Sequence, residues 1–133
     1  MRIENIKFKA KRLDNGEWVE GSLTYSQGIA YIHRKESDKD DRCYLTPYEV
    51  IPETVCQFTG MMDEDCNEIW EGDIVHDSYD LLCIDNLYEV VYIEEEGTFA
   101  FKSLDKVDNY GNYSAPPMGM SNRLTVVLQQ ELH

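Results

Sequence analysis

The 133-residue sequence predicts an all-β fold, made mainly of antiparallel strands. Apolar and polar residues alternate with a period of two in several short segments, which is typical of strands that bury one face. Turn-forming dipeptides such as Asn15-Gly16 separate these segments. No segment places apolar residues at helical spacing, and no glycine-rich strand-to-helix junction of a nucleotide-binding fold is present.

The first strands follow directly from this alternation. In "IKFKA" the apolar side chains share one face, and we expect Lys7 and Lys9 to lie on the other, exposed face. Asn15-Gly16 supplies the two positive-φ residues of a tight turn, and a second turn is expected at residues 26–28. The strands predicted here are residues 6–10, 18–25 and 29–33.

The next segment is less regular. Residues 34–42 contain no apolar side chain, so we expect an exposed loop. Pro47 and Pro52 lack backbone donors, and each would interrupt a central strand. We therefore predict short strands around Tyr44 and at residues 55–58, joined by an irregular crossing.

The C-terminal half contains the clearest hairpin of the sequence. A long loop at residues 105–123 carries Tyr110 and Tyr113, and loops of this length often bind something. The other predicted elements are a strand from Ile74, a hairpin with arms at 88–93 and around Phe99 and Phe101, its turn at 94–97, and a closing strand at 124–128 with one helical turn after it.

Charge is the most unusual bulk property. The chain has 12 Lys and Arg against 26 Asp and Glu, a net charge of −14. Residues 1–35 hold 7 basic and 4 acidic side chains, whereas residues 36–133 hold 5 and 22. We therefore expect no direct binding of nucleic acid. The acidic field is typical of a protein kept soluble by its charge, and it also fits a surface that docks a basic partner or mimics DNA.

Cysteine spacing and hydropathy exclude several classes of protein. The four cysteines form no C-x-x-C pair, which argues against a zinc site, and we expect reduced, mostly buried thiols. No apolar run approaches the ~20 residues that cross a bilayer, and the N-terminus lacks the apolar stretch of a signal peptide. We expect a cytoplasmic protein with no membrane contact and no cofactor. The cysteines are Cys43, Cys56, Cys66 and Cys83.

The stretch "TGMMDEDCNEIWEGDIV" holds a dense group of acidic residues. Asp63, Asp65 and Asn67 fall at positions 1, 3 and 5 of an EF-hand loop, but Glu68 stands where that loop needs glycine and Ile74 where it needs a bidentate glutamate. The ligand set is incomplete, so we predict no metal site. Weak binding of a divalent ion near Asp63 is the alternative.

Catalysis finds little support in the same stretch. Glu71 and Asp73 flank Gly72, and pairs of acids two apart arise by chance in so acidic a chain. None of the three histidines belongs to a recognisable serine or cysteine nucleophile motif. We predict no catalytic residue and no enzyme. A metal-dependent hydrolase, the third class considered, would need ligands converging around Asp63, Asp65 and His76.

Two tight turns account for more of these residues. We expect Thr59-Gly60 to end a strand, residues 63–68 to form a polar turn with Asn67 in the left-handed conformation, and Gly72 to make a second reversal. Asp73 can then accept hydrogen bonds from nearby backbone amides. Burial holds both turns in place, through Ile69, Trp70, Ile74 and Val75.

The segment "FTGMMDEDCNEIWEGDIV" resembles the signature of the YopX family, whose members are encoded by bacterial phages and prophages. The starting segment "IKFKAKRLDNGEWVEG" and the later "YEVVYIEEEGTFAF" and "LTVVL" are similar to that family's strands in the same order. The family-motif residues, expected to form a structural turn and a candidate binding surface, are Thr59, Gly60, Asp63, Asn67, Glu68, Ile69, Trp70, Glu71, Gly72, Asp73, Ile74 and Val75.

The sequence departs from the family pattern at three places. Glu68 stands where the family often has glycine followed by a polar residue, Met61-Met62 replaces an aliphatic-lysine pair, and the closing segment lacks a Gly-Asn. The resemblance implies an all-β protein with a small SH3-like β-barrel, no established biochemical activity and no catalytic residues. We accordingly expect an N-terminal antiparallel region at residues 1–55 and an SH3-like barrel that carries the motif at residues 56–133.

These observations lead to one expected function and one alternative. We expect a noncatalytic phage or prophage accessory protein in the host cytoplasm, which binds an unidentified host or phage protein or assembles as a homo-oligomer through exposed strand edges. The alternative is an acidic inhibitor that mimics DNA and occupies a host DNA-binding protein. A mimic should carry its carboxylates along one face and bind with a steep salt dependence.

Overall fold

The computed structural model describes residues 2–77, 87–104, 113–114 and 124–128. Their regular structure consists of antiparallel strands and two short 3₁₀ turns, which confirms the predicted all-β class. The chain divides into two units, Met1–Phe58 and Thr59–His133, and each is described by itself. Within the described part of the chain, no helix is long and apolar enough to cross a membrane.

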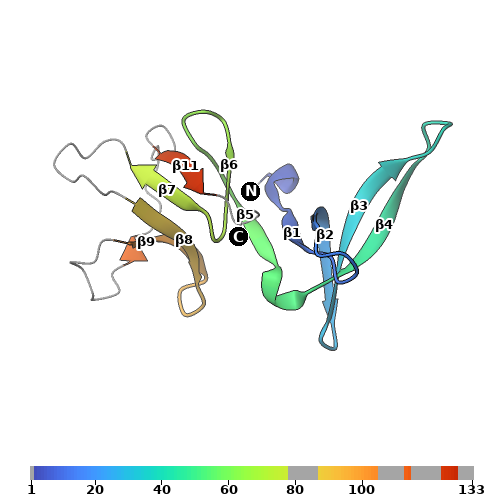
Figure 1. The fold of residues 1–133 in the computed structure, drawn as a ribbon, viewed down its shortest axis with the longest axis horizontal. Coiled ribbons are helices and arrows are strands. Elements are labelled where there is room, and N and C mark those ends of the chain that lie inside the picture. The colour runs from blue at the N-terminus through green and yellow to red at the C-terminus, as the bar shows by residue number, and fades with distance from the viewer. Residues whose placement is uncertain (1, 78–86, 105–112, 115–123, 129–133) are drawn as a thin grey trace. The chain divides into compact units, whose positions relative to one another are not determined.

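The first unit is an antiparallel sheet with the strand order β4-β3-β2-β1-β5 (Figure 1). Its register is that of successive hairpins: β1 pairs with β2, β2 with β3, and β3 with β4. The elements are η1 (Ile3–Asn5), β1 (Phe8–Lys11), β2 (Trp18–Ser26), β3 (Ile29–Ser37), β4 (Cys43–Val50), η2 (Pro52–Thr54) and β5 (Cys56–Met62), which runs on into the second unit.

The core of the first unit comes from the apolar positions of these alternating strands. Ala10 pairs with Val19 across β1 and β2, and Ala30 pairs with Val50 across β3 and β4. These four residues and Ile32 are at most 2 % exposed. Partly buried side chains complete the cluster, and they are Phe8, Leu23, Tyr48 and Val55.

Lys9 departs from the expected pattern. The alternation predicted an exposed lysine, but Lys9 is only 6 % exposed, and its Nζ lies 5.3 Å from the centre of the Trp18 ring. A long aliphatic stem can be buried along apolar surface, and the face of an aromatic ring attracts the ammonium group. Both faces of β1 are therefore partly covered by other side chains, which a period-two pattern alone does not reveal.

The β2 strand bends at Gly21, where it passes from one partner to the next. Residues Trp18–Gly21 pair with β1, and Ser22–Ser26 pair with β3. A Cβ atom built on Gly21 would lie 2.1 Å from the carbonyl oxygen of His33. Only a residue without a side chain allows the two backbones to approach this closely.

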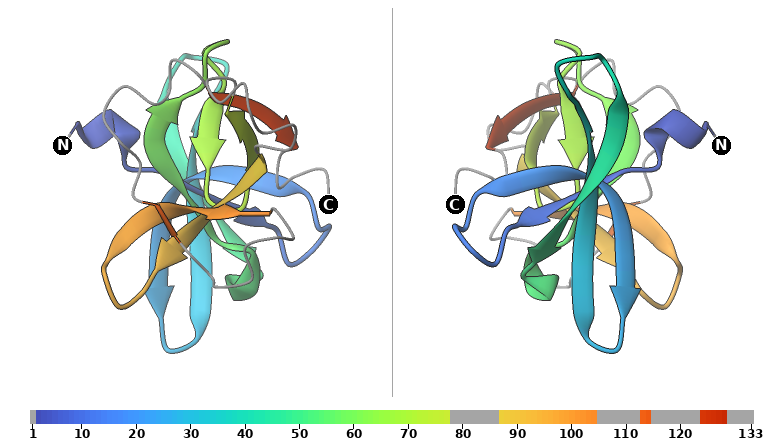
Figure 2. Two further views of the ribbon diagram at one scale, coloured as in Figure 1. Left: turned by 90° about the vertical axis from the view of Figure 1, so that its left-hand side faces the viewer. Right: turned by 90° about the vertical axis from the view of Figure 1, so that its right-hand side faces the viewer.

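The loop predicted at residues 34–42 is strand as far as Ser37, so the first part of this prediction is wrong. β3 continues to Ser37, β4 begins at Cys43, and only the turn between them is irregular. Beyond His33 the two strands no longer have β2 as a neighbour, and Figures 1 and 2 show them as a long two-stranded ribbon. Cross-strand pairing stabilises the ribbon although it buries no apolar face, which is why apolar patterning missed it.

The second unit contains a five-stranded antiparallel sheet in the order β10-β9-β8-β7-β11. β6 pairs with the end of β5, and Ile69 of β6 packs with Val75, Val90 and Phe101 of the five-stranded sheet to form the core. The elements are β6 (Glu68–Trp70), β7 (Ile74–Asp77), β8 (Leu87–Ile93), β9 (Thr98–Ser103), β10 (Tyr113–Ser114) and β11 (Leu124–Leu128).

This sheet is not the closed SH3-like barrel that the family resemblance implied. Among the described strands, β10 and β11 end the sheet without pairing with each other. Closure of a barrel requires continuous staggered pairing around the whole circumference, which the described strands do not provide. The predicted loop at 105–123 lies mostly outside the described residues, as does the helical turn after Leu128.

We predict that Gly21→Ala destabilises the first unit. The added methyl group meets a backbone carbonyl that cannot move freely, so the free energy of unfolding should fall by about 1–3 kcal/mol. Denaturant unfolding followed by circular dichroism measures this loss, and amide hydrogen exchange in β2 and β3 assigns it to the first unit. Ser22→Ala, at the neighbouring exposed position, is the control and should leave stability unchanged; equal stability of both variants would contradict the close approach.

Candidate functional site

The first turn of the acidic motif is organised around the carboxylate of Asp63, which is 4 % exposed. Oδ1 accepts hydrogen bonds from the backbone amides of Asp65 and Asn67, each at 2.8 Å. Oδ2 accepts a bond from Asn67 Nδ2 at 3.2 Å. The backbone closes the same turn, because Asp63 N donates to Asn67 O and Cys66 N donates to Asp63 O.

Asp63 also fixes the last described strand. Its Oδ2 accepts a hydrogen bond from the backbone amide of Val126 at 3.0 Å, and Thr125 Oγ1 donates to Glu64 Oε1 at 2.7 Å. Burial by itself raises the pKa of the Asp63 carboxyl, but the hydrogen bonds from Val126, Asn67 and Asp65 together outweigh it and hold the pKa below its ordinary value of 3.8. One ionised side chain thus connects the β5–β6 turn with β11.

The second turn is organised around Asp73, which is fully buried. Its Oδ2 accepts a bond from Trp70 N at 2.8 Å, and its own amide donates to Trp70 O at 3.1 Å. Gly72, at φ 90°, donates to Val90 O, and Val90 N donates to Asp73 O. The reversal between β6 and β7 is therefore bonded both to itself and to β8.

The other motif residues support these two turns. Thr59 Oγ1 donates to Ile69 O at 2.7 Å and accepts a bond from Met61 N, and Gly60 has φ 84°. Ile69 and Val75 are fully buried and Trp70 is 4 % exposed. Three residues at the edges of the turns are half-buried, namely Glu68, Glu71 and Ile74.

The left-handed residue of the first turn is Cys66, at φ 64°, and not Asn67 as the sequence predicted. Asn67 has a different task, because its side chain and its backbone amide both donate to Asp63. Cys66 lies where the turn closes onto the Asp63 carbonyl oxygen. The left-handed residue is therefore the one whose amide closes the turn, one position before Asn67.

The buried carboxylates of this motif accept hydrogen bonds from amide groups of the chain. Both Asp63 oxygens and Asp73 Oδ2 accept hydrogen bonds from N–H groups of the chain itself. No group of three or more histidine, cysteine, aspartate or glutamate side chains in the described part of the chain could hold a metal ion, so Asp63, Asp65 and His76 are not gathered into one. The described cysteines are reduced, but the expectation that they are mostly buried is wrong, because Cys43 and Cys66 are exposed and only Cys56 is buried. Cys83 lies outside the described residues.

A different surface of the molecule offers unpaired backbone groups, and it is the outer edge of β4. Leu13 N donates to Glu49 O, and Ile51 N donates to Lys11 O, so the odd-numbered residues at this end of β4 turn their backbone groups away from β3. At the other end Asp38 N donates to Arg42 O, so the even-numbered residues turn toward β3. Backbone groups point alternately to the two sides of a strand, and both ends of β4 give the same assignment. The odd-numbered residues of β4 therefore direct their N–H and C=O groups outward.

This alternation also explains why Pro47 is tolerated inside a strand. Pro47 is odd-numbered, so the amide that it lacks would have pointed outward, where β4 has no neighbouring strand. The prediction that Pro47 interrupts the strand is therefore wrong. No hydrogen bond of the described residues reaches the outward groups of Cys43, Leu45 and Pro47.

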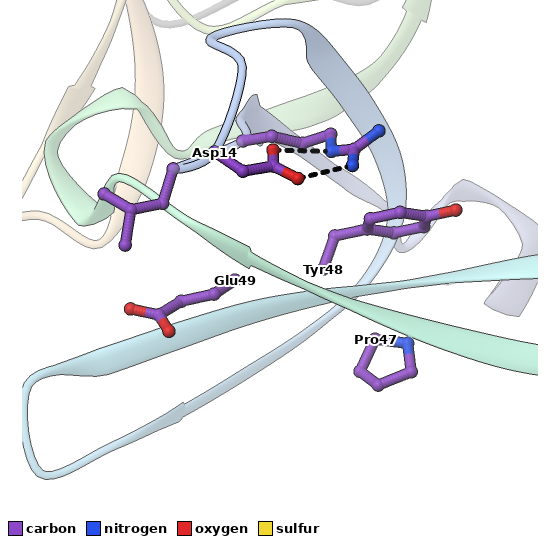
Figure 3. A pocket seen from close by; sticks show the side chains of 6 residues that line it. Asp14, Pro47, Tyr48 and Glu49 are labelled. Carbon is purple, nitrogen blue, oxygen red and sulfur yellow. Dashed lines mark hydrogen bonds and ion pairs between the residues drawn. The ribbon is translucent and has the colours of Figure 1, made fainter.

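A hollow of about 250 Å³ lies where the covered part of this edge ends (Figure 3). Asp14 forms one wall, and its carboxylate receives two hydrogen bonds from Arg12, at 3.0 Å from Nε and 2.7 Å from Nη2. These bonds lower the pKa of the Asp14 carboxyl. The lining residues are Arg12, Leu13, Asp14, Pro47, Tyr48 and Glu49.

Tyr48 connects the hollow to the ribbon. The guanidinium carbons of Arg12 and Arg34 lie 4.4 Å and 5.0 Å from the centre of its ring, and its hydroxyl donates to Glu36 Oε1 at 2.6 Å. Glu36 also accepts bonds from Arg34 and Thr46. The bond from Tyr48 and then those from Arg34 and Thr46 lower the pKa of the Glu36 carboxyl to about 2.

Sequence reasoning missed this surface. A signal was present, because Arg34 and Glu36 stand two apart, as do Thr46 and Tyr48, and residues two apart share a face of a strand. Polar residues with this spacing can stabilise a ribbon through cross-strand hydrogen bonds without any apolar stripe.

Comparison with known proteins identifies the family. A family model described as "YopX protein" matches residues 7–118, which is most of the chain. The chain therefore belongs to the YopX family, and the resemblance seen in its sequence is confirmed. No curated protein matches the chain.

We predict that Asp63→Asn weakens the second unit. The amide replaces one acceptor oxygen with a donor that faces other N–H groups, so the free energy of unfolding should fall by about 1–3 kcal/mol at neutral pH. Fluorescence of Trp70 in a Trp18→Phe background reports on this unit during denaturant unfolding. Asp65→Asn, two residues away and exposed, is the matched control and should change little.

The same pair of variants tests the pH dependence. The folded-state pKa of Asp63 is lowered, so its contribution is present above the unfolded value of 3.8 and is lost as the pH falls through the folded pKa. The stability difference between the wild type and Asp63→Asn should therefore shrink as the pH falls from neutral to below the ordinary carboxyl value of 3.8. A difference that does not change with pH would show that the carboxylate charge is irrelevant.

Proposed function

We propose that this member of the YopX family is a noncatalytic accessory protein of phage or prophage origin, which acts by pairing a strand of a protein partner with β4. The partner can be another protein of the host or phage, or a second copy of the chain. Family membership supports the accessory class, because the resemblance implies no established activity.

The observation that carries the proposal is the unpaired outer edge of β4. Its outward amide and carbonyl groups at Cys43 and Leu45, and the carbonyl of Pro47, are available to another strand. Tyr44 is 48 % and Leu45 63 % exposed, one on each face of the strand. An exposed edge with apolar side chains is a template for strand addition, where main-chain bonds provide affinity and side chains provide specificity.

The motif geometry supports a noncatalytic role. A general acid or base has to reach a substrate, whereas the carboxylates of Asp63 and Asp73 accept hydrogen bonds from the backbone that they organise. Their burial is accounted for by these bonds. The most distinctive residues of the family signature thus have a structural task in this chain.

The acidic field supports a second candidate, a mimic of DNA. The first unit holds 9 basic and 10 acidic side chains, whereas the second holds 3 and 16, a net charge of −13. In the described part of the second unit, however, exposed carboxylates gather in two turns, one with Glu64 and Asp65 and one at residues 94–96, and Figures 1 and 2 place these turns at opposite ends of the unit. That placement is unlike a row of phosphates, so we rank mimicry second.

Affinity capture from a phage-carrying host tests the proposal. We expect Leu45→Lys to abolish retention of the partner, because a charge on the edge opposes strand addition. Tyr25→Lys is the matched control, since Tyr25 is also 63 % exposed but lies outside β4, and it should retain the partner. Capture at about 0.15 M and about 0.5 M salt separates docking from charge attraction, because salt screens exposed charges.

Two results would contradict the proposal. One is a captured set that is unchanged by Leu45→Lys and disappears with salt, which would favour the acidic mimic. The other is turnover of a substrate by the purified protein that is lost in Asp73→Asn or Glu71→Gln, which would make the motif catalytic.

A further inference from the structure

We infer that the strand that pairs with β4 is β4 of a second copy of the chain, antiparallel and related by a two-fold axis at Leu45. This inference rests on the proposed function and deepens it by naming the partner. Three properties of the edge lead to it: its hydrogen-bonding groups, its side chains and its charge.

The hydrogen-bonding groups of the edge complement a second copy of themselves. In the Leu45-centred pairing, the two Leu45 residues exchange two N–H···O bonds, and Cys43 N of each copy donates to Pro47 O of the other. Pro47 has no amide, so it serves only as an acceptor there, and Cys43 supplies the donor that it needs. The Cys43 carbonyl oxygen is then the only outward group of residues 43–47 without a partner, and it lies at the rim, where water can reach it.

The side chains agree with this register. Residues that face each other across an antiparallel pair lie on the same face, so the two Leu45 side chains would meet, and Tyr44 of each copy would lie beside Thr46 of the other. Leu45 and Tyr44 are the two large apolar residues exposed on β4. The pairing thus removes from water the apolar surface that the monomer exposes on this strand.

The distribution of charge favours contact between two copies at the β3–β4 ribbon. Each chain has a net charge of −14, so most pairs of surfaces repel. Residues 34–48, by contrast, hold four basic and four acidic side chains and are neutral. The ribbon is therefore a segment through which like molecules approach with little repulsion.

The covered end of the edge limits the interface. Lys11 and Leu13 already bond to Ile51 and Glu49, so a second β4 can extend only as far as Pro47 and the hollow beside it. A five-residue overlap is much smaller than a standard protein interface, so we expect a weak dimer that forms at high concentration.

Disulfide trapping tests the register. In a background of Cys43→Ser, Cys66→Ser and Cys83→Ser, Leu45→Cys should cross-link two chains under mild oxidation, because directly opposed residues of an antiparallel pair lie about 5.5 Å apart, within disulfide range. Tyr25→Cys, with the same exposure outside β4, should cross-link at least about tenfold more slowly. Faster cross-linking through Tyr44→Cys than through Leu45→Cys would overturn the Leu45-centred pairing.

Sedimentation of the uncross-linked protein tests the dimer itself. Leu45→Pro removes only an outward amide, so the β3–β4 bonds remain and circular dichroism should be unchanged, while the dimer dissociation constant should rise at least about tenfold. Leu45→Ala keeps the amide and should have a smaller effect. A wild-type chain that stays monomeric up to about 1 mM, with no Leu45→Cys cross-link, overturns self-pairing. Leu45-dependent capture of another protein would in that case still support the proposed function, so the two failures are distinguishable.

Discussion

Burial of two carboxylates among backbone amides is the constraint on which the second unit depends. An ionised side chain without partners would cost several kcal/mol in the interior, and the same group with several N–H donors becomes an organising centre. Asp63 gathers donors from its own turn and from Val126, 63 positions later, while Asp73 fixes the reversal that docks on Val90. Two of the six acidic residues in the motif, Asp63 and Asp73, are thus explained by the backbone amides that two successive reversals leave to be satisfied.

Much of the fold could be predicted from the sequence, because many of its turns and strands are specified by residues close together in the chain. The alternation around Phe8 and Ala10 and the glycine at position 72 each specify a conformation within a few residues. At Asn15-Gly16 the prediction of two positive-φ residues is wrong, because only Gly16 has a positive φ and β1 and β2 are joined by a longer loop. The role of Asp73 as an acceptor of nearby amides follows from the same short range. The link from Asp63 to Val126 could not be predicted, because it joins residues that only the folded sheet brings together.

The errors of prediction share a physical cause, which is that neighbours along the chain do not determine neighbours in space. The ribbon at Arg34–Ser37 is stabilised by its partner strand, and Pro47 fits because β4 happens to be an edge. Lys9 is buried because Trp18 lies opposite the strand, and the left-handed residue is Cys66, whose amide closes the turn onto the Asp63 carbonyl oxygen. The closed barrel implied by the resemblance is absent among the described strands, because β10 and β11 end the sheet without pairing with each other.

The departure of β2 from the ribbon gives the first unit two levels of cooperativity. Beyond His33, β3 and β4 pair only with each other, so their outer half can separate without disturbing the buried cluster around Ile32. Segments of this kind open by sub-global fluctuations that cost less than global unfolding. The ribbon also carries Arg34, Lys35, Lys39 and Arg42. Within the first unit, a trypsin-like protease would consequently cut this ribbon before it cuts the strands around the buried cluster.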